Sequence, residues 1–212
     1  MKNVSMAQIL ARLKKFDAEL RAARERISHL EEQIETDPLL NVLNRRGFER
    51  ELNRALAYVR RYRTSAGLIF IDLDNFKVIN DRHGHLAGDA ILKAIAANLS
   101  SHTRASDVVG RYGGDEFVLV LWNATEPQVR ARAQAHEAMI ASLEVPFADL
   151  VLHAGATAGV AMLGADDHAS GVVERADADM YSNKIAKTQI AKTRGIRSVR
   201  RRPRTTGERL RA

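Results

Sequence analysis

Apolar residues recur at alternating steps of three and four positions along residues 1–35, and neither glycine nor proline interrupts them. These residues are Met6, Ile9, Leu13, Phe16, Leu20, Ala23, Ile27, Leu30 and Ile34. A mean step of about 3.5 residues over about four heptads is typical of a coiled-coil seam. In a parallel dimer, the charges that face each other would be opposite in three pairs. The pairs are Arg12 with Asp17, Glu19 with Arg24, and Arg26 with Glu31.

The pattern therefore predicts that residues 1–35 form a parallel coiled coil that makes the protein a homodimer. Exposed charge pairs contribute only a few tenths of a kcal/mol each, so the apolar seam would supply stability and the charges would select orientation. The alternative is an amphipathic helix that packs on its own domain.

After Asp37 and Pro38 the heptad period ends and a compact domain is expected over residues 36–190. Helical periodicity predicts helices over 45–62, 76–83, 87–100, 126–143 and 170–187. Apolar runs predict strands over 66–73, 107–111, 117–122 and 152–162. This alternation, with one hairpin, indicates an α/β sandwich with a mixed sheet flanked by helices.

Composition limits the remaining possibilities. The 212 residues are 45% hydrophobic and 28% charged, with a mean hydropathy of −0.27, which suits one globular domain with appendages. The chain has no cysteine, so disulfides and thiolate metal sites are excluded, leaving oxygen and imidazole ligands. No apolar run is long enough to span a bilayer and the first residues do not resemble a secretory signal, so we expect a cytoplasmic protein without a transmembrane segment.

The formal net charge of +7 is concentrated at one end. Residues 194–212 carry eight arginines and one acid, Glu208, so the charge of this segment equals that of the whole chain. A segment with so few apolar residues cannot bury enough surface to order itself, so residues 191–212 are predicted to be a solvated, disordered basic tail. Contact of this tail with nucleic acid or anionic lipid is the less favoured alternative.

Candidate chemistry begins where the predicted strand 66–73 runs into Asp72, Leu73 and Asp74. Acids at the end of a buried strand lie at the sheet edge, where oxygen ligands can hold a hard cation such as Mg²⁺. Capping of the following helix is an equally ordinary role for such residues.

The predicted hairpin adds more acids beside this edge. It reads Arg111-Tyr112-Gly113-Gly114-Asp115-Glu116-Phe117, and we expect the two glycines to form a two-residue turn at positive φ. Neighbouring strand residues point to opposite faces, so Asp115 and Glu116 cannot both be structural acids on one side. The Gly-Gly pair also lets phosphates approach the backbone. The combination suggests a metal–nucleotide site.

At these residues the sequence resembles the GGDEF family, the diguanylate cyclases. The resemblance covers about residues 36–187 and follows motifs at 37–46 (DPLLNVLNRR), 72–81 (DLDNFKVIND), 84–89 (GHLAGD), 111–117 (RYGGDEF) and 176–187 (ADADMYSNKIAK). It implies a five-stranded mixed central sheet flanked by helices, related to the palm of nucleotidyl cyclases and polymerases. It also implies condensation of two GTP molecules into cyclic di-GMP and two pyrophosphates.

The resemblance implies a role for each matching residue. Asp72, the carbonyl of Leu73, Asp115 and Glu116 would hold Mg²⁺, or Mn²⁺ in its place, and Asp115 and Glu116 would be catalytic. The triphosphate would be bound by Lys77 and Lys184, by backbone groups around Asn75 and Phe76, and beside Gly113 and Gly114. Asn80 and Asp89 would read guanine, whose edge an amide and a carboxylate complement. For His83 and His85 a structural role is favoured over metal binding.

Each domain would supply one GTP, so two hairpins must face each other and the coiled coil would raise their effective concentration. The sequence departs from the family at 40–42, where Leu-Asn-Val replaces the usual Thr-Gly-Leu, and at Thr188, where an arginine usually contacts phosphate. Lys187 or a later arginine would have to compensate for Thr188. A catalytically silent module that binds GTP or cyclic di-GMP as a receptor is therefore the alternative function.

Arg104 and Asp107 form an RxxD tetrapeptide, with five residues between Asp107 and Gly113. This spacing resembles the family's inhibitory product site, and Arg and Asp can bind phosphate and guanine edges. The alternative is a surface ion pair between the two side chains.

Overall fold

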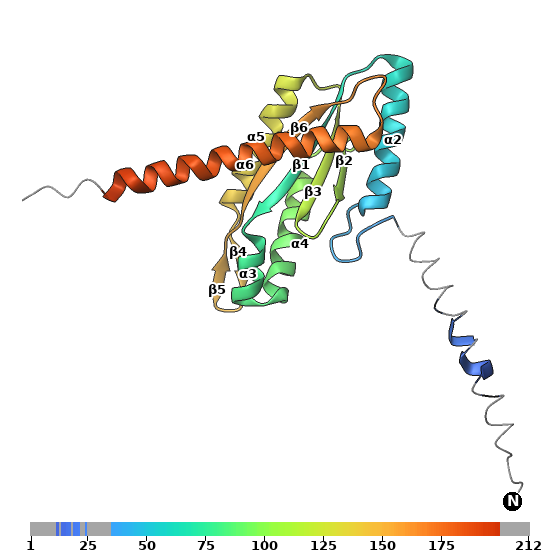
Figure 1. The fold of residues 1–212 in the computed structure, drawn as a ribbon, viewed down its shortest axis with the longest axis horizontal. Helices are drawn as coiled ribbons and strands as arrows, with labels where there is room; N and C mark the ends of the chain where they lie inside the picture. The colour runs from blue at the N-terminus through green and yellow to red at the C-terminus, as the bar shows by residue number, and fades with distance from the viewer. Residues whose placement is uncertain (1–11, 13, 18, 22–23, 25–34, 200–212) are drawn as a thin grey trace, which may run out of the picture.

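The computed structural model describes residues 12, 14–17, 19–21, 24 and 35–199. From residue 35 onward, helices and strands alternate (Figure 1). The elements are α2 (Arg45–Tyr62), β1 (Ala66–Asp74), α3 (Phe76–His83), α4 (His85–Ser101), β2 (Val108–Arg111), β3 (Glu116–Trp122), α5 (Glu126–Ser142), β4 (Val145–Phe147), β5 (Leu150–Leu152), β6 (Gly155–Met162) and α6 (Ala169–Val199).

The central sheet has four strands in the order β2-β3-β1-β6, and each neighbouring pair is antiparallel. Strands β4 and β5 form a separate two-stranded sheet. Because β1 lies inside the central sheet and pairs with both β3 and β6, the residues at its end are flanked by two strands.

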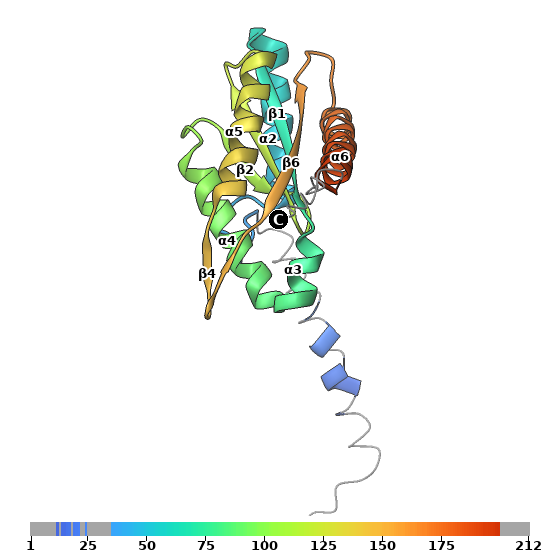
Figure 2. The ribbon, with the colours of Figure 1, turned by 90° about the vertical axis from the view of Figure 1, so that its left-hand side faces the viewer.

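Both faces of the sheet are covered, so β1 is apolar along nearly its whole length. Ile69, Ile71 and Leu73 join one core with α4 and α5, whereas Leu68 and Phe70 join a second core with α2 and α6. Figure 2 shows the sheet between α5 on one side and α6 on the other. Alternation of side chains across the pleat thus divides one apolar run between two helical layers.

The expected five-stranded mixed sheet differs from this arrangement. Among the described residues the central sheet has four strands, and the parallel pairing recorded there is an isolated bridge between Leu43 and Gly110. The chain that contains Leu43 cannot continue as an edge strand, because the next residue, Asn44, already caps α2. The side chain of Asn44 accepts a hydrogen bond from Gly47 N at 2.9 Å. A fifth strand is therefore reduced to a single bridge.

Other boundaries also shift. The strand expected over 152–162 is divided, since Leu150–Leu152 pairs with β4 and only Gly155–Met162 joins the central sheet. The helix expected over 170–187 continues to Val199, so part of the segment predicted to be disordered is helical. No proline interrupts this extension before Pro203. Residues 200–212 lie outside the described residues.

Most of the predicted coiled coil also lies outside the described residues. Two seam residues that are described, Phe16 and Leu20, are 70% and 51% exposed. None of the described helices combines the length and the apolar character needed to cross a membrane.

Candidate active site

The acids singled out from the sequence meet where β1 ends and β3 begins. Asp72 of β1 is the register partner of Glu116, the first residue of β3. The preceding residue, Asp115, is tied to β1 by a hydrogen bond from Leu73 N to its carbonyl oxygen at 3.1 Å. The antiparallel pairing therefore brings three carboxylates from two distant segments to one edge of the sheet.

This clustering changes the acidity of both hairpin acids. Partial burial is the main reason that the pKa of Asp115 and that of Glu116 are raised, and the charge of Asp72 raises both further. For Glu116, the charges of Asp115 and Asp177 act in the same direction. Carboxylates that repel one another in a half-buried position favour a bound cation.

A cation from α6 already reaches this cluster. Lys184 Nζ forms an ion pair with Asp72 Oδ1. The same lysine lines a pocket of about 270 Å³ with Asn75, Thr157, Lys187 and Thr188. Lys184 thus lies between the carboxylates and an open pocket at the end of β1.

The described part of the chain contains no preformed metal site of three or more acidic or histidine side chains. Asp72, Asp115 and Glu116 nevertheless offer the hard oxygen ligands that Mg²⁺ and Mn²⁺ prefer, and the raised pKa of the two hairpin acids fits a site that a divalent ion would stabilise. His83 ends α3 and His85 begins α4, on either side of Gly84.

The connection between β2 and β3 differs from the expected two-residue turn. It spans residues 112–115, and neither Gly113 nor Gly114 has a φ in the left-handed region. A side chain at Gly113 would instead overlap the Glu116 carboxylate, whereas open space surrounds Gly114. A Cβ at position 113 would therefore displace the Glu116 carboxylate, while the backbone angle of Gly113 does not itself demand glycine.

An arginine that the sequence analysis did not single out holds this connection from inside. Arg111 donates to the carbonyl oxygens of Gly113 and Gly114, with Nη2 at 2.7 Å from the latter. Its Nη1 lies 3.0 Å from Asp37 Oδ2, and both side chains are largely buried. The motifs at 37–46 and 111–117 contain these residues, but only the fold reveals that they touch.

An aromatic contact supports the other side of the connection. Tyr112 donates its hydroxyl hydrogen to Glu49 Oε1 at 3.1 Å, and the guanidinium of Arg45 lies 4.5 Å from the centre of its ring. Both partners belong to α2, so the hairpin is anchored to this helix as well as to Asp37.

The residues expected to bind nucleotide lie along the turn from β1 to α4. Asn75 adopts a left-handed conformation with φ 58° just before Phe76 begins α3, and Lys77 is exposed. Asn80 of α3 and Asp89 of α4 are half-buried. The Oδ1 atom of Asn80 packs against Gly88, and within the described chain it is buried and accepts no hydrogen bond. An unsatisfied amide oxygen marks a position suited to a polar ligand or an ordered water.

Thr188 and Lys187 do not replace the missing arginine in this structure. The Thr188 hydroxyl donates to the carbonyl oxygen of Lys184 at 2.9 Å. Lys187 Nζ lies 2.8 Å from Glu137 Oε1 and donates to Ala156 O, also at 2.8 Å. Its ammonium group therefore contacts strand β6 and helix α5.

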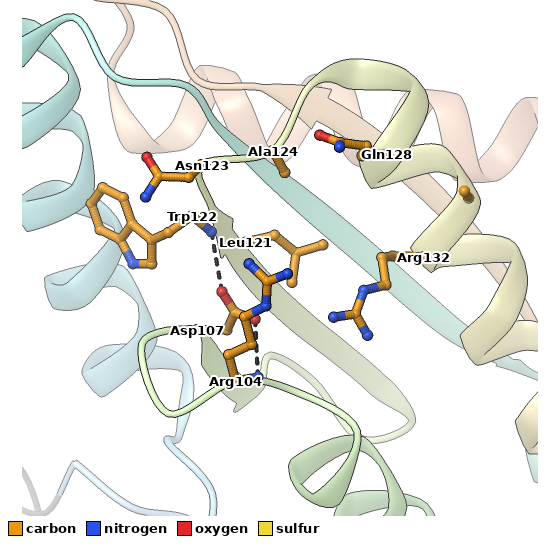
Figure 3. A pocket seen from close by; sticks show the side chains of 9 residues that line it. Arg104, Asp107, Leu121, Trp122, Asn123, Ala124, Gln128 and Arg132 are labelled. Atoms are coloured by element: carbon orange, nitrogen blue, oxygen red, sulfur yellow. Dashed lines mark hydrogen bonds between the residues drawn. The ribbon is translucent and has the colours of Figure 1, made fainter.

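The RxxD residues line a separate pocket of about 330 Å³ (Figure 3). Asp107 accepts hydrogen bonds from the backbone N–H groups of Arg104 and Trp122, both at 3.1 Å, and no ion pair joins its carboxylate to the Arg104 guanidinium. The predicted alternative of a surface ion pair is therefore wrong. Figure 3 shows Arg104 and Arg132 directing their guanidinium groups into this pocket. Arg132, from α5, was not recognised in the sequence because it lies in a different element from the tetrapeptide.

Comparison with known proteins agrees with the family resemblance that the sequence motifs indicate. Residues 34–189 match the family described as "Diguanylate cyclase, GGDEF domain". The chain is 34% identical over 163 residues to probable diguanylate cyclase DgcE of Escherichia coli strain K12, covering 76% of this chain and 15% of that protein. It is 37% identical over 164 residues to diguanylate cyclase DgcP of Pseudomonas aeruginosa, covering 75% and 24%.

A solved structure is also similar. The crystal structure of the coiled coil and GGDEF domain of DgcB from Caulobacter crescentus, in complex with c-di-GMP, has a TM-score of 0.69 and 27% identity. The match covers 84% of this chain and 95% of that one. By contrast, the chain spans less than a quarter of the length of the two curated relatives.

Proposed function

Because this chain belongs to the GGDEF family of diguanylate cyclases, we propose that it condenses two GTP molecules into cyclic di-GMP and releases two pyrophosphates. The observation that carries the proposal is the meeting of Asp72, Asp115 and Glu116 at the end of β1, with the pKa of both hairpin acids raised. Three carboxylates that repel one another would only destabilise the end of the strand if their role were purely structural.

The carboxylates of Asp72, Asp115 and Glu116, with the carbonyl of Leu73, would hold Mg²⁺ or Mn²⁺. Bound there, the ion would supply charge neutralisation at the α-phosphate. Lys184, Lys77 and the backbone around Asn75 and Phe76 would bind the triphosphate. Support for this assignment comes from the pocket that Asn75 and Lys184 share.

Asn80 and Asp89 would select guanine. The packing of the Asn80 amide against Gly88 supports this role, because it brings Asn80 next to the residue that precedes Asp89. Asp89, one helix away, offers a carboxylate to N1–H and N2–H of the same base.

In the reaction, the 3′-OH of one GTP attacks the α-phosphorus of the other, a P–O bond forms and pyrophosphate leaves. The hydroxyl proton would pass to a hairpin acid, and Glu116 suits this role because it begins β3 directly opposite Asp72 in the acid cluster. A second attack of the same kind closes the ring.

Each domain would bind one GTP, so two copies must meet face to face. The exposure of Phe16 and Leu20 supports a homodimer formed through the predicted seam. The similar DgcB structure also combines a coiled coil with a GGDEF domain. Arg104, Asp107 and Arg132 would bind the product at an inhibitory site, and c-di-GMP is present in that neighbour.

Incubation of the protein with GTP and Mg²⁺, followed by chromatography, tests the proposal. We expect cyclic di-GMP and pyrophosphate, and no product when Mg²⁺ is chelated. A protein that binds GTP or cyclic di-GMP but makes no product with either Mg²⁺ or Mn²⁺ would be a receptor module instead.

A further inference from the structure

Strand β6 forms one edge of the central sheet, and side chains of α6 bond to its outward-facing backbone groups. Four α6 residues at intervals of four contact four β6 residues at intervals of two. The contacts are Arg175 Nη2 to Met162 O at 3.1 Å, Val160 N to Asp179 Oδ2 at 2.8 Å, Asn183 Nδ2 to Ala158 O at 2.9 Å, and Lys187 Nζ to Ala156 O at 2.8 Å. We call this set the α6–β6 ladder.

The ladder is regular because the two repeats nearly match in length. Four residues of an α-helix rise about 6.0 Å, and two residues of a strand advance about 6.6 Å. The helix backbone also lies directly on the strand, since a side chain at Gly159 would overlap Met180 N and Ala176 O. Sliding of α6 along β6 would break all four contacts together.

Helix α5 contacts residues of three of these four pairs. Glu137 Oε1 accepts from Ala158 N at 2.6 Å and from Lys187 Nζ at 2.8 Å. Arg130 pairs with Asp179 at 3.1 Å. The ladder is therefore held from two helices.

The ladder sits beside the candidate active site. Thr157, between Ala156 and Ala158, is the register partner of Asp72. Lys184 lies between Asn183 and Lys187 in α6 and reaches the carboxylate of that same Asp72. The ladder contacts at Ala156 and Ala158 therefore lie on either side of Thr157, the residue that pairs with Asp72.

We propose that Asp179 and Asn183 are positioning residues that fix the axial register of α6 and thereby hold the Lys184 ammonium group between Asp72 and the triphosphate of GTP. This inference rests on the proposed function. Asp179 and Asn183 line a different pocket from the one shared by Asn75 and Lys184. They act on the nucleotide only through the helix.

A double-mutant cycle between Asn183→Ala and Lys184→Ala tests the inference. The readouts are KM and kcat for GTP, together with the calorimetric Kd for 3′-deoxy-GTP with Mg²⁺, which binds but lacks the attacking hydroxyl. We expect Asn183→Ala to raise KM and Kd about fivefold in the wild-type background and by less than about 1.5-fold when Lys184 is already alanine, because coupled residues are not additive.

Two further variants separate positioning from general stability. Asp179→Asn keeps an oxygen that can accept from Val160 N, so it should restore the nucleotide affinity that Asp179→Ala loses. Ser182→Ala, whose hydroxyl bonds only to Ala178 O within α6, is the matched control and should leave both constants unchanged. Circular dichroism and melting curves establish that each variant is folded.

Equal effects of Asn183→Ala in both backgrounds would overturn the inference while the proposed function stands. If the wild type makes no cyclic di-GMP but binds 3′-deoxy-GTP, the proposed function fails and the binding cycle still decides the inference. Absence of nucleotide binding by the wild type overturns both. Should Asn183→Ala not fold, the Asp179→Ala and Asp179→Asn pair gives the same comparison.

Discussion

Asp72 and Glu116 are direct register partners across the antiparallel β1–β3 pair, so two carboxylates occupy facing positions in the sheet. Like charges directly opposite each other destabilise a strand pair. Here the charge of Asp72 contributes to the raised pKa of Glu116. The arrangement is costly for folding and useful for binding a cation.

Neutralising either hairpin acid should abolish turnover without unfolding the protein. Asp115→Asn and Glu116→Gln remove charge with little change in volume, and we expect product formation to fall at least about 100-fold. Chromatography of the product and circular dichroism of each variant check this. Turnover within threefold of the wild type in both variants would contradict the assignment.

The Glu116→Gln substitution should also stabilise the metal-free protein at neutral pH. Because the folded-state pKa of Glu116 is raised, the folded state holds a proton that the unfolded state releases between the usual and the raised value. Stability is lost as pH rises through that window, and the loss persists above it. Melting curves in chelator should therefore show Glu116→Gln to be more stable than the wild type at pH 7, with the difference vanishing below the usual glutamate pKa.

Replacing Arg111 should loosen the connection that carries the proposed catalytic acids. Arg111→Lys keeps the charge but cannot bond to Asp37 and to both glycine carbonyls at once, so we expect kcat to fall about tenfold or more from misplacement of the acids. Arg54→Lys, on the exposed surface of α2, is the control. An unchanged kcat for Arg111→Lys would show that the hairpin is positioned without this clamp.

Removing the predicted coiled coil should weaken self-association. The deletion should stop at residue 34, because Glu35 accepts from Asn44 N at 2.9 Å and pairs with Arg50. At nanomolar concentration we expect a monomer whose specific activity rises with protein concentration. Analytical ultracentrifugation measures this, and a truncated chain that stays dimeric at that concentration would refute the role of the seam.

Product inhibition should depend on the two arginines that point into the RxxD pocket. Arg104→Ala and Arg132→Ala should each weaken cyclic di-GMP binding at least about tenfold, since each removes a charge-assisted contact to phosphate or guanine. Initial rates should be retained, and inhibition of the wild type should be noncompetitive with GTP. Calorimetry that finds unchanged product affinity in both variants would rule out this pocket as the inhibitory site.

The local elements could be predicted where periodicity and caps agree. Helices Arg45–Tyr62 and Phe76–His83 occupy the ranges predicted from the sequence, and in the structure Asn44 caps the first and Gly84 follows the second. Helix α6 was predicted too short, because the basic, apolar-poor composition of residues 191–212 indicates disorder, although no proline interrupts the helix before Pro203. The candidate acids were recognised from their motifs, and their convergence follows from strand pairing.

Contacts between distant segments could not be predicted in the same way. Arg111 and Asp37 are 74 residues apart, and their pairing depends on how the segment before α2 folds back over β2. The α6–β6 ladder requires that the helix run antiparallel to the strand at close distance. Gly159 permits this close approach, but a glycine in a strand does not by itself predict it. Arg132 lines the RxxD pocket because the first turns of α5 lie next to the end of β3, so residues of both elements border the same cavity.

The α6–β6 ladder has a further consequence for a protein proposed to work as a pair of facing domains. An open strand edge is a template on which another chain can add a strand, and such pairing leads to domain swapping or aggregation. Here charged and amide side chains occupy the outward backbone groups of β6, and Leu43 bridges to Gly110 of β2 at the opposite edge. Two copies held together at high local concentration can therefore approach through their nucleotide sites, while their sheets have little opportunity to merge.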